Sequence, residues 1–195
     1  MKKPQTNSKT AECLMKAFIG EGAARNRYTY FAKKAKQEGF EQISSIFIET
    51  ADNEKEHAKR FFKFLGEEFH PIEIHSAAYP SGLSNSTLNN LHYAAQGEHE
   101  ENTLLYPSFE NIAKEEGYDD VAKCFREIIE AEKVHERRYL DLYENIKENK
   151  VFKKDNEVIW KCRNCGYHFK GKNAPEICPA CLHPISYFEV FIKNY

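Results

Sequence analysis

Glutamates and histidines spaced three residues apart are the side chains of this 195-residue chain best suited to bind a metal. In a helix, this spacing puts both side chains on one face. One match is weak support, because chance predicts about one in a chain of this composition. Two matches nevertheless lie inside expected helices: Glu54 with His57, and Glu132 with His135. We set aside the third, Glu67 with His70, because it follows Gly66 in an expected connection.

The two helical pairs hold equivalent places in an internal repeat, whose offset of 78 residues separates Glu54 from Glu132. The segments 38–40 (Glu-Gly-Phe) and 116–118 (Glu-Gly-Tyr) match at this offset, as do Arg60 and Arg138. Packing does not require identical charged residues. We therefore favour a duplicated helical hairpin, whose halves contribute to one site, over a chance likeness between two hairpins.

The other two expected helices supply carboxylates among small residues. Glu21 lies between Gly20 and Gly22, and Glu98 follows Gly97. Glu101 lies one turn beyond Glu98 and faces the same way. Several buried carboxylates repel one another and need cations to stay ionised. One Glu from each of two helices, with Glu-x-x-His from each of the other two, is the arrangement of di-iron carboxylate bundles.

Hard oxygen ligands with a few imidazoles suit iron or manganese better than copper. Tyr28 and Tyr106 lie near the candidate glutamates along their helices and could hydrogen-bond a ligand carboxylate. Core packing is an equally good account of either tyrosine. The other histidines match no position of the pattern, and we expect surface or structural roles for them: His75, His92, His99, His168 and His183.

Four cysteines near the C-terminus form a second candidate centre: Cys162, Cys165, Cys178 and Cys181. Two Cys-x-x-Cys pairs at this separation indicate one tetrahedral metal site. Spacing alone does not distinguish iron from zinc in four thiolates. We interpret the site as iron because an electron-transfer centre has a use beside a redox di-iron site. Cys13 and Cys124 are isolated in helical patterns, and we expect them to be buried core residues.

The elements that position these residues are expected to be four helices near 10–38, 41–65, 84–116 and 119–147. Gly39 and Gly117 each end a helix, and Asp119 is the expected cap of the last one. Two short loops and one long connection over 66–83 predict a ferritin-like four-helix bundle with one long crossover. We divide the chain into a bundle over 1–150 and a small four-cysteine domain with short β-strands over 151–195, which needs a metal to fold.

The composition excludes some classes of function. The net charge of −2 predicts neither a nucleic-acid partner nor an anionic-membrane partner. No apolar stretch approaches the roughly 20 residues that cross a bilayer. The polar N-terminus lacks the apolar region of a signal peptide, so we expect a cytoplasmic protein.

The motifs closely resemble the rubrerythrin family over nearly the whole chain. The resemblance lies in Gly20-Glu21, Arg27 to Tyr30, Asn53 to Phe62, Gly97-Glu98-His99, Tyr106-Pro107, and the Cys-Gly-Tyr and Cys-Pro-x-Cys knuckles. It implies that two irons are bound by Glu21, Glu54, Glu98, Glu101, Glu132 and His135, and one iron by the four cysteines. It also implies that His57 and Glu101, the catalytic pair, exchange as ligands to one iron with redox state.

The implied activity is the reduction of hydrogen peroxide to water in oxidative-stress defence. The four-cysteine iron would re-reduce the di-iron site, and a head-to-tail homodimer or a higher assembly is implied. The resemblance also implies an NADH-dependent reductase as the electron donor, directly or through a small rubredoxin. No nucleotide-binding motif occurs here, so we expect that NADH does not bind this chain itself. Two alternatives stay open: a ferroxidase that stores iron, and a zinc-stabilised binding module without redox chemistry.

Overall fold

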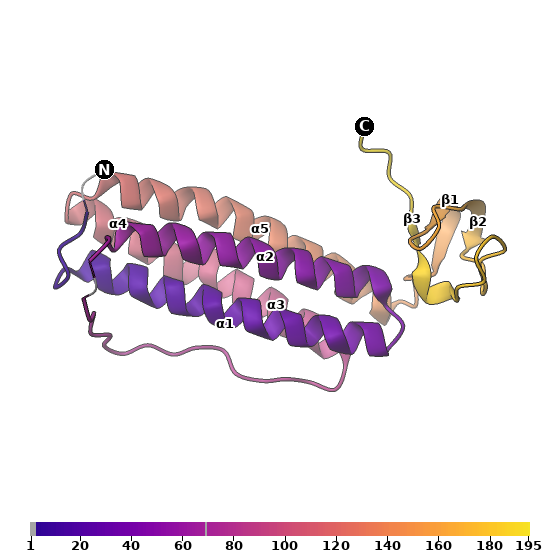
Figure 1. Cartoon of the computed structure of the whole chain (residues 1–195), viewed down its shortest axis with the longest axis horizontal. Coiled ribbons are helices and arrows are strands. Elements are labelled where there is room, and N and C mark those ends of the chain that lie inside the picture. Colours follow the sequence, from indigo (N-terminus) through magenta and orange to yellow (C-terminus); the bar gives the residue numbers. More distant parts are fainter. Residues whose placement is uncertain (1–2, 69) are drawn as a thin grey trace.

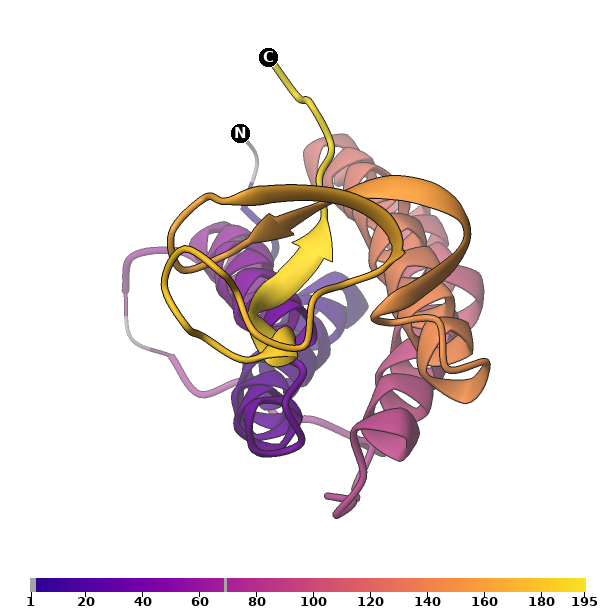
Figure 2. The same ribbon diagram turned by 90° about the vertical axis from the view of Figure 1, so that its right-hand side faces the viewer.

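The computed structural model describes residues 3–68 and 70–195 of the chain. The first helical pair consists of α1 (Lys9–Gln37) and α2 (Glu41–Phe64), and the second pair ends with α5 (Asp119–Lys147). The pairs lie side by side as a long bundle (Figure 1), and the view from one end separates them clearly (Figure 2). A crossover segment, described over residues 65–68 and 70–86, runs along the bundle beside α1 and joins the pairs. The predicted ferritin-like arrangement with one long crossover is confirmed.

Both short loops end a helix in the same way. Gly39 and Gly117 have φ angles of 82° and 75°, in the left-handed region that favours glycine. The next amide in each loop donates back into the preceding helix, from Phe40 to the Ala35 carbonyl and from Tyr118 to the Ala113 carbonyl. The glycine stops are therefore confirmed. The expected cap at Asp119 is wrong, because Asp119 is already the first residue of α5 and Tyr118 precedes the helix.

The helix expected over 84–116 is in fact interrupted. It consists of α3 (Thr87–Glu100), a π-helical turn η1 (Glu101–Leu105) and α4 (Tyr106–Glu115). A π-helical turn adds one residue to an α-helix. The insertion is visible in the repeat as an offset that grows by one residue across the turn. Glu21 and Glu98 are offset by 77 residues, whereas Tyr28 and Tyr106 are offset by 78. Periodicity alone did not predict the turn, which begins at Glu101.

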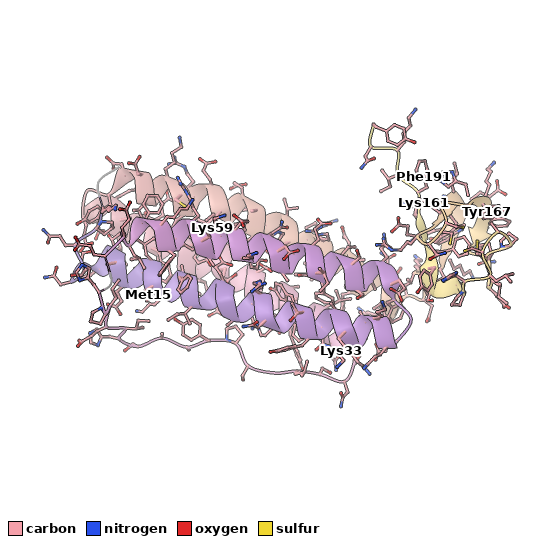
Figure 3. The ribbon with its side chains drawn as sticks, viewed as in Figure 1. Met15, Lys33, Lys59, Lys161, Tyr167 and Phe191 are labelled. Atoms are coloured by element: carbon pink, nitrogen blue, oxygen red, sulfur yellow. The ribbon has the colours of Figure 1, made fainter. Side chains whose placement is uncertain are left out.

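Two apolar clusters fill the bundle, one on each side of the candidate ligands. The first contains Leu14, Phe61 and Phe125, and the second contains Phe31, Phe47 and Tyr139. On each of α1, α2 and α5 the ligand glutamate lies between a member of one cluster and a member of the other. Lys33 and Lys59 are exposed on α1 and α2 (Figure 3). The carboxylates are thus held at mid-bundle, between the two clusters, while these two lysines lie on the outer surface.

The C-terminal part, called the tail below, is a small antiparallel sheet of strand order β2-β1-β3. Its elements are β1 (Lys153–Cys162), β2 (His168–Asn173), a 3-10 turn η2 (Ile185–Tyr187) and β3 (Phe188–Val190). Trp160 and Phe188 pack with two of the cysteines to form its core. The tail lies at the end of the bundle (Figure 1), where the rings of Phe40 and Phe152 stack with centroids 6.2 Å apart. In the described ranges, none of the helices has the length and apolarity of a membrane span.

Candidate metal centres

Two groups of ligand atoms converge in the middle of the bundle. The first group is Glu21, Glu54, His57 and Glu132, and the second is Glu54, Glu98, Glu132 and His135. Within each group, one ligand atom from every residue lies within 4.8 Å of the others. Glu54 and Glu132 belong to both groups. The structure thus brings together six of the seven residues predicted for this site.

Each shared carboxylate turns one oxygen toward each histidine. Glu54 Oε2 lies 2.9 Å from His57 Nδ1, and its Oε1 lies 3.2 Å from His135 Nδ1. Glu132 repeats this pattern, with Oε1 at 2.8 Å from His57 Nδ1 and Oε2 at 2.8 Å from His135 Nδ1. A carboxylate that spans two adjacent cation positions needs this orientation. The duplicated Glu-x-x-His pairs therefore produce a nearly two-fold arrangement of donors.

The buried atoms of this site lack the hydrogen bonds that buried polar atoms usually make. Among the residues that the structure describes, eight such atoms have no hydrogen-bond partner: Oε2 of Glu21 and of Glu98, both oxygens of Glu54 and of Glu132, and Nδ1 of His57 and of His135. The four glutamates are at most 1% exposed. Six of these atoms, on Glu54, Glu132 and the two histidines, have carboxylate–imidazole ion pairs with one another as their close contacts. Burying so many charged groups together is costly, and two divalent cations would satisfy all eight atoms. The donor set therefore fits a pair of metal ions.

The electrostatics of the protein without metal lead to the same conclusion. Burial, followed by the charges of Glu132 and Glu54, raises the pKa of Glu21 well above its usual value. The pKa of Glu98 is raised by the same two causes. Burial opposes ionisation of His57 too, but the nearby Glu132 and Glu54 carboxylates outweigh it and raise the pKa of His57 to about 10. The site therefore takes up protons when cations are absent and releases them when cations bind.

Two tyrosines hold the outer carboxylates, each across the repeat. Tyr28 of the first half donates to Glu98 Oε1 of the second at 2.5 Å, and Tyr106 donates to Glu21 Oε1 at 2.6 Å. Both tyrosines are 1% exposed. The suggested hydrogen bonding to candidate ligands is present. Sequence spacing did not predict the crossed pairing, because it depends on how the two hairpins pack.

Glu101 is placed differently from the other six residues. In the described part of the chain it belongs to neither group, and its side chain is half-buried at the start of η1. Its Oε1 lies 3.7 Å from the position that a Cβ on Gly20 would take. Burial and the charges of Glu132 and Glu54 raise the pKa of Glu101 well above its usual value. Glu101 therefore lies beside the first group but outside it.

One polar network near the site was not predicted from the sequence. Asn102, inside η1, donates to the Glu98 carbonyl at 2.7 Å and to Glu136 Oε2 at 2.7 Å. Glu136 also lies 2.9 Å from His99 Nδ1 through its other oxygen. The network ties the π-helical turn to α5 directly beside His135. The one feature of the sequence that marks this place is the extra residue in the repeat between Glu98 and Tyr106, where the network forms.

The four cysteines of the tail form a compact second centre, with one sulfur from each within 4.8 Å of the others. Cys162 Sγ is 3.7 Å from Cys181 Sγ, and Cys165 Sγ is 3.7 Å from Cys178 Sγ. In the described ranges all six cysteines are free, and Cys13 and Cys124 are buried as expected. The backbone N–H of His183 lowers the pKa of Cys181 to about 6. A low thiol pKa favours the thiolate form that binds metal.

Comparisons with known proteins agree with this two-part organisation. A family model described as Rubrerythrin matches residues 12–143, and one described as Rubrerythrin, rubredoxin-like domain matches residues 160–189. A rubrerythrin of Clostridium perfringens is 57% identical, and the match covers 96% of this chain and 97% of that protein. A rubrerythrin of Nitratidesulfovibrio vulgaris is 52% identical, with 96% and 97% covered. A solved structure of fully reduced, all-ferrous nigerythrin is 32% identical, with a TM-score of 0.62 and 97% and 89% covered.

Proposed function

This chain belongs to the rubrerythrin family, and we propose that it reduces hydrogen peroxide to water in oxidative-stress defence, with electrons that pass from the four-cysteine centre to the di-iron centre. The family is one of oxidoreductases with a di-iron, ferritin-like domain. The observation that carries the proposal is the presence of two metal-binding donor sets of different chemistry in one chain. Oxygen and imidazole donors suit an iron pair that reacts with peroxide, and four thiolates suit a one-electron carrier.

We assign the iron pair to Glu21, Glu54, His57, Glu98, Glu132 and His135, with Glu101 as the seventh ligand. Two ferrous ions would supply one electron each to the O–O bond, so that H2O2, two electrons and two protons give two molecules of water. Glu54 and Glu132 would contribute to both metal positions, because each turns one oxygen toward His57 and the other toward His135. Tyr28 and Tyr106 hold Glu98 and Glu21 in place through hydrogen bonds.

His57 and Glu101 are the proposed mobile pair. His57 Nδ1 lies in the first group, whereas the Glu101 carboxylate lies just outside it, beside Gly20. A carboxylate and an imidazole that alternate as ligands would match the change in charge when the irons lose electrons. The π-helical turn supports this role. Glu101 begins this turn, whereas the equivalent part of the first repeat lies in the regular α-helix α1.

The tail of one chain lies far from the di-iron site of the same chain. Glu54 lies fourteen residues beyond Phe40, which contacts the tail, and this corresponds to about 20 Å along the helix axis. Direct electron transfer over such a separation is slow. We therefore propose a head-to-tail homodimer in which each tail serves the bundle of its partner, with a rubredoxin or an NADH-dependent reductase as the external donor.

Co-expression of two complementary variants tests this dimer. Cys178→Ser inactivates the tail, and Glu132→Gln inactivates the di-iron site of the other chain. If the tail serves its partner, the purified mixed dimer holds one working pair of centres and reduces peroxide, whereas each homodimer is inactive. If the tail serves its own bundle, the mixed dimer is inactive as well, and the head-to-tail proposal fails.

Anaerobic stopped-flow mixing of the fully reduced protein with hydrogen peroxide tests the activity itself. We expect rapid reoxidation of the di-iron site, followed by the appearance of the visible absorption of ferric iron in four thiolates as electrons leave the reduced tail. Metal analysis of the same sample separates the alternatives. Zinc in both sites and a colourless protein would favour the non-redox binding module, and a large cage that mineralises iron would favour ferroxidase storage.

A further inference from the structure

A cavity of about 140 Å³ lies beside the di-iron site, under the crossover segment. Its lining includes the apolar side chains of Ala17, Leu105 and Phe109. Glu101 and Tyr106 line it too, as does Tyr79 of the crossover segment. The cavity thus combines apolar residues with polar residues that lie next to the metal ligands.

The cavity leads to the first ligand group through two residues. Gly20 lines the cavity and is adjacent to Glu21 in the sequence. A Cβ at Gly20 would lie 3.7 Å from Glu101 Oε1 and 3.9 Å from Cε1 of Tyr79. Tyr106, which also lines the cavity, donates to Glu21 through its hydroxyl. The lining of the cavity therefore adjoins Glu21, a member of the first ligand group, through Gly20 in the sequence and through the Tyr106 hydroxyl.

The crossover segment is tied to α1 at Tyr79 itself and four residues before it. The backbone N–H of His75 donates to Glu12 Oε1 at 2.8 Å, and the Tyr79 hydroxyl donates to the Lys16 carbonyl at 3.3 Å. Lys16 and Glu12 pair with each other at 2.9 Å. Tyr79 thus has a defined position although its side chain is 38% exposed. These contacts hold Tyr79 against α1 at the cavity.

We propose that this cavity is the substrate chamber of the di-iron site and that Tyr79 and Gly20 set the largest hydroperoxide that it accepts. The inference rests on the proposed peroxide reductase activity and extends it to small alkyl hydroperoxides. An engineered cavity of about 150 Å³ in another protein holds benzene or xenon. A hydroperoxide with a compact alkyl group fits such a space, with its alkyl group on the Leu105 and Phe109 wall and its O–O bond toward Glu101. A larger arylalkyl hydroperoxide does not fit.

The reaction of the alkyl substrate balances in the same way as that of hydrogen peroxide. One ROOH, two electrons and two protons give one ROH and one water, because the O–O bond breaks and each oxygen gains a proton. The electrons come from the reduced di-iron site, which the tail then re-reduces. The chamber adds only the choice of R.

Three oxidants and two variants test the chamber by stopped-flow reoxidation of the reduced protein. The natural chain should react with hydrogen peroxide and tert-butyl hydroperoxide, and poorly with cumene hydroperoxide. Tyr79→Ala should raise the ratio of the cumene hydroperoxide rate to the hydrogen peroxide rate at least about tenfold, because pocket contacts of this size discriminate by such factors. Tyr30→Ala, a change at a tyrosine exposed elsewhere on α1, should alter neither rate.

Gly20→Ala tests the opposite direction. Its Cβ meets Glu101 and Tyr79 at ordinary contact distances, so the chain should fold while the passage narrows. We expect the tert-butyl hydroperoxide rate to fall at least about tenfold, with a much smaller change for hydrogen peroxide. Gly22→Ala is the matched control, because in the described structure a Cβ at Gly22 would meet no heavy atom within 4 Å.

Xenon provides a test that needs neither iron nor activity. Crystals of the zinc-loaded protein under xenon pressure should show xenon against Leu105 and Phe109, and Gly20→Ala should reduce its occupancy while Gly22→Ala does not. Failure of the natural chain to react with any hydroperoxide would overturn the proposed activity. In that case the chamber stands if xenon binds against Leu105 and Phe109, and it is overturned if xenon does not bind there. Normal hydrogen peroxide reduction with unchanged selectivity in Tyr79→Ala and Gly20→Ala would overturn the chamber alone.

Discussion

The ligands of the bundle and of the tail are assembled over different distances in the chain. In the bundle, the donors run from Glu21 to His135 and come from separate helices that meet only through packing. In the tail, four cysteines lie between Cys162 and Cys181, and two knuckles supply all of them. Large apolar clusters flank the bundle site on both sides, whereas the tail has one small cluster that includes two of its own ligands.

This difference separates two uses of a metal. The bundle buries enough apolar surface to fold although its buried carboxylates repel one another, and bound cations would neutralise this repulsion. The tail is too small to fold on its apolar residues alone, so its metal is a structural requirement in addition to its proposed role as an electron carrier. Metal loss should therefore unfold the tail and leave the bundle folded but sensitive to pH.

The largest expected effect is that of Cys178→Ser, which removes a fully buried ligand from the tail core. We expect the tail to unfold, because metal binding in such sites contributes on the order of 10 kcal/mol to folding. The backbone amides of residues 153–190 should lose their protection against hydrogen exchange, while the helical circular dichroism signal of the bundle persists. Cys13→Ser, at a buried cysteine in the bundle, should leave tail protection intact. Continued protection of the tail in Cys178→Ser would contradict the comparison.

The second effect concerns pH in the metal-free bundle. Despite the opposing effect of burial, neighbouring carboxylates raise the pKa of His57 to about 10 and of His135 to about 9. Groups with a raised pKa bind more protons when folded, so their stabilisation is complete below pH 6.5 and is lost as the pH rises. The glutamates with raised pKa act in the same direction.

We expect the metal-free bundle to lose at least about 2 kcal/mol of unfolding free energy above pH 6.5, because one pKa unit corresponds to about 1.4 kcal/mol. Urea unfolding with a chelator present, from pH 6.5 to about 9, measures this loss. The metal-loaded protein is the control and should show no such fall, because cations replace the protons. A flat profile for the metal-free protein would mean that the carboxylates are not held as close as the structure places them.

A smaller effect is expected from the tyrosines that support the bundle site. Tyr28→Phe removes the hydroxyl that donates to Glu98, and Tyr106→Phe removes the one that donates to Glu21. Each change should weaken metal affinity about tenfold, as loss of a hydrogen bond to a ligand commonly does. Titration with cobalt(II) should show one weakened position in each variant and an unchanged tail site. Tyr30→Phe, at an exposed tyrosine, is the control, and equal affinities in all three variants would contradict the role.

The smallest effect lies at the contact between the two regions. Phe40→Leu removes the ring that stacks on Phe152 but keeps an apolar side chain. An aromatic pair contributes about 1 kcal/mol, so hydrogen exchange at residues 151–153 should accelerate by about fivefold or less. Both metal sites should keep their absorption spectra. A loss of either metal from Phe40→Leu would show that the regions depend on each other more than the comparison allows.

The amino-acid sequence by itself determined the kinds of ligand and most of their identities. Residues at i and i+3 must share a helix face, and Cys-x-x-Cys must form a knuckle, because both depend only on local backbone geometry. Gly39 and Gly117 likewise predicted the two hairpins. The repeat then predicted which pairs would meet, since a duplicated hairpin brings equivalent positions together.

Only the tertiary structure decided how those residues face one another. It placed Glu101 outside both ligand groups, crossed the hydrogen bonds of Tyr28 and Tyr106 between the halves, and laid Tyr79 over a cavity beside Gly20. Each of these features joins segments far apart in the sequence, through the π-helical turn or the crossover segment. Local periodicity cannot predict such contacts. They depend on the packing of one hairpin against the other and on the path of the crossover segment over α1.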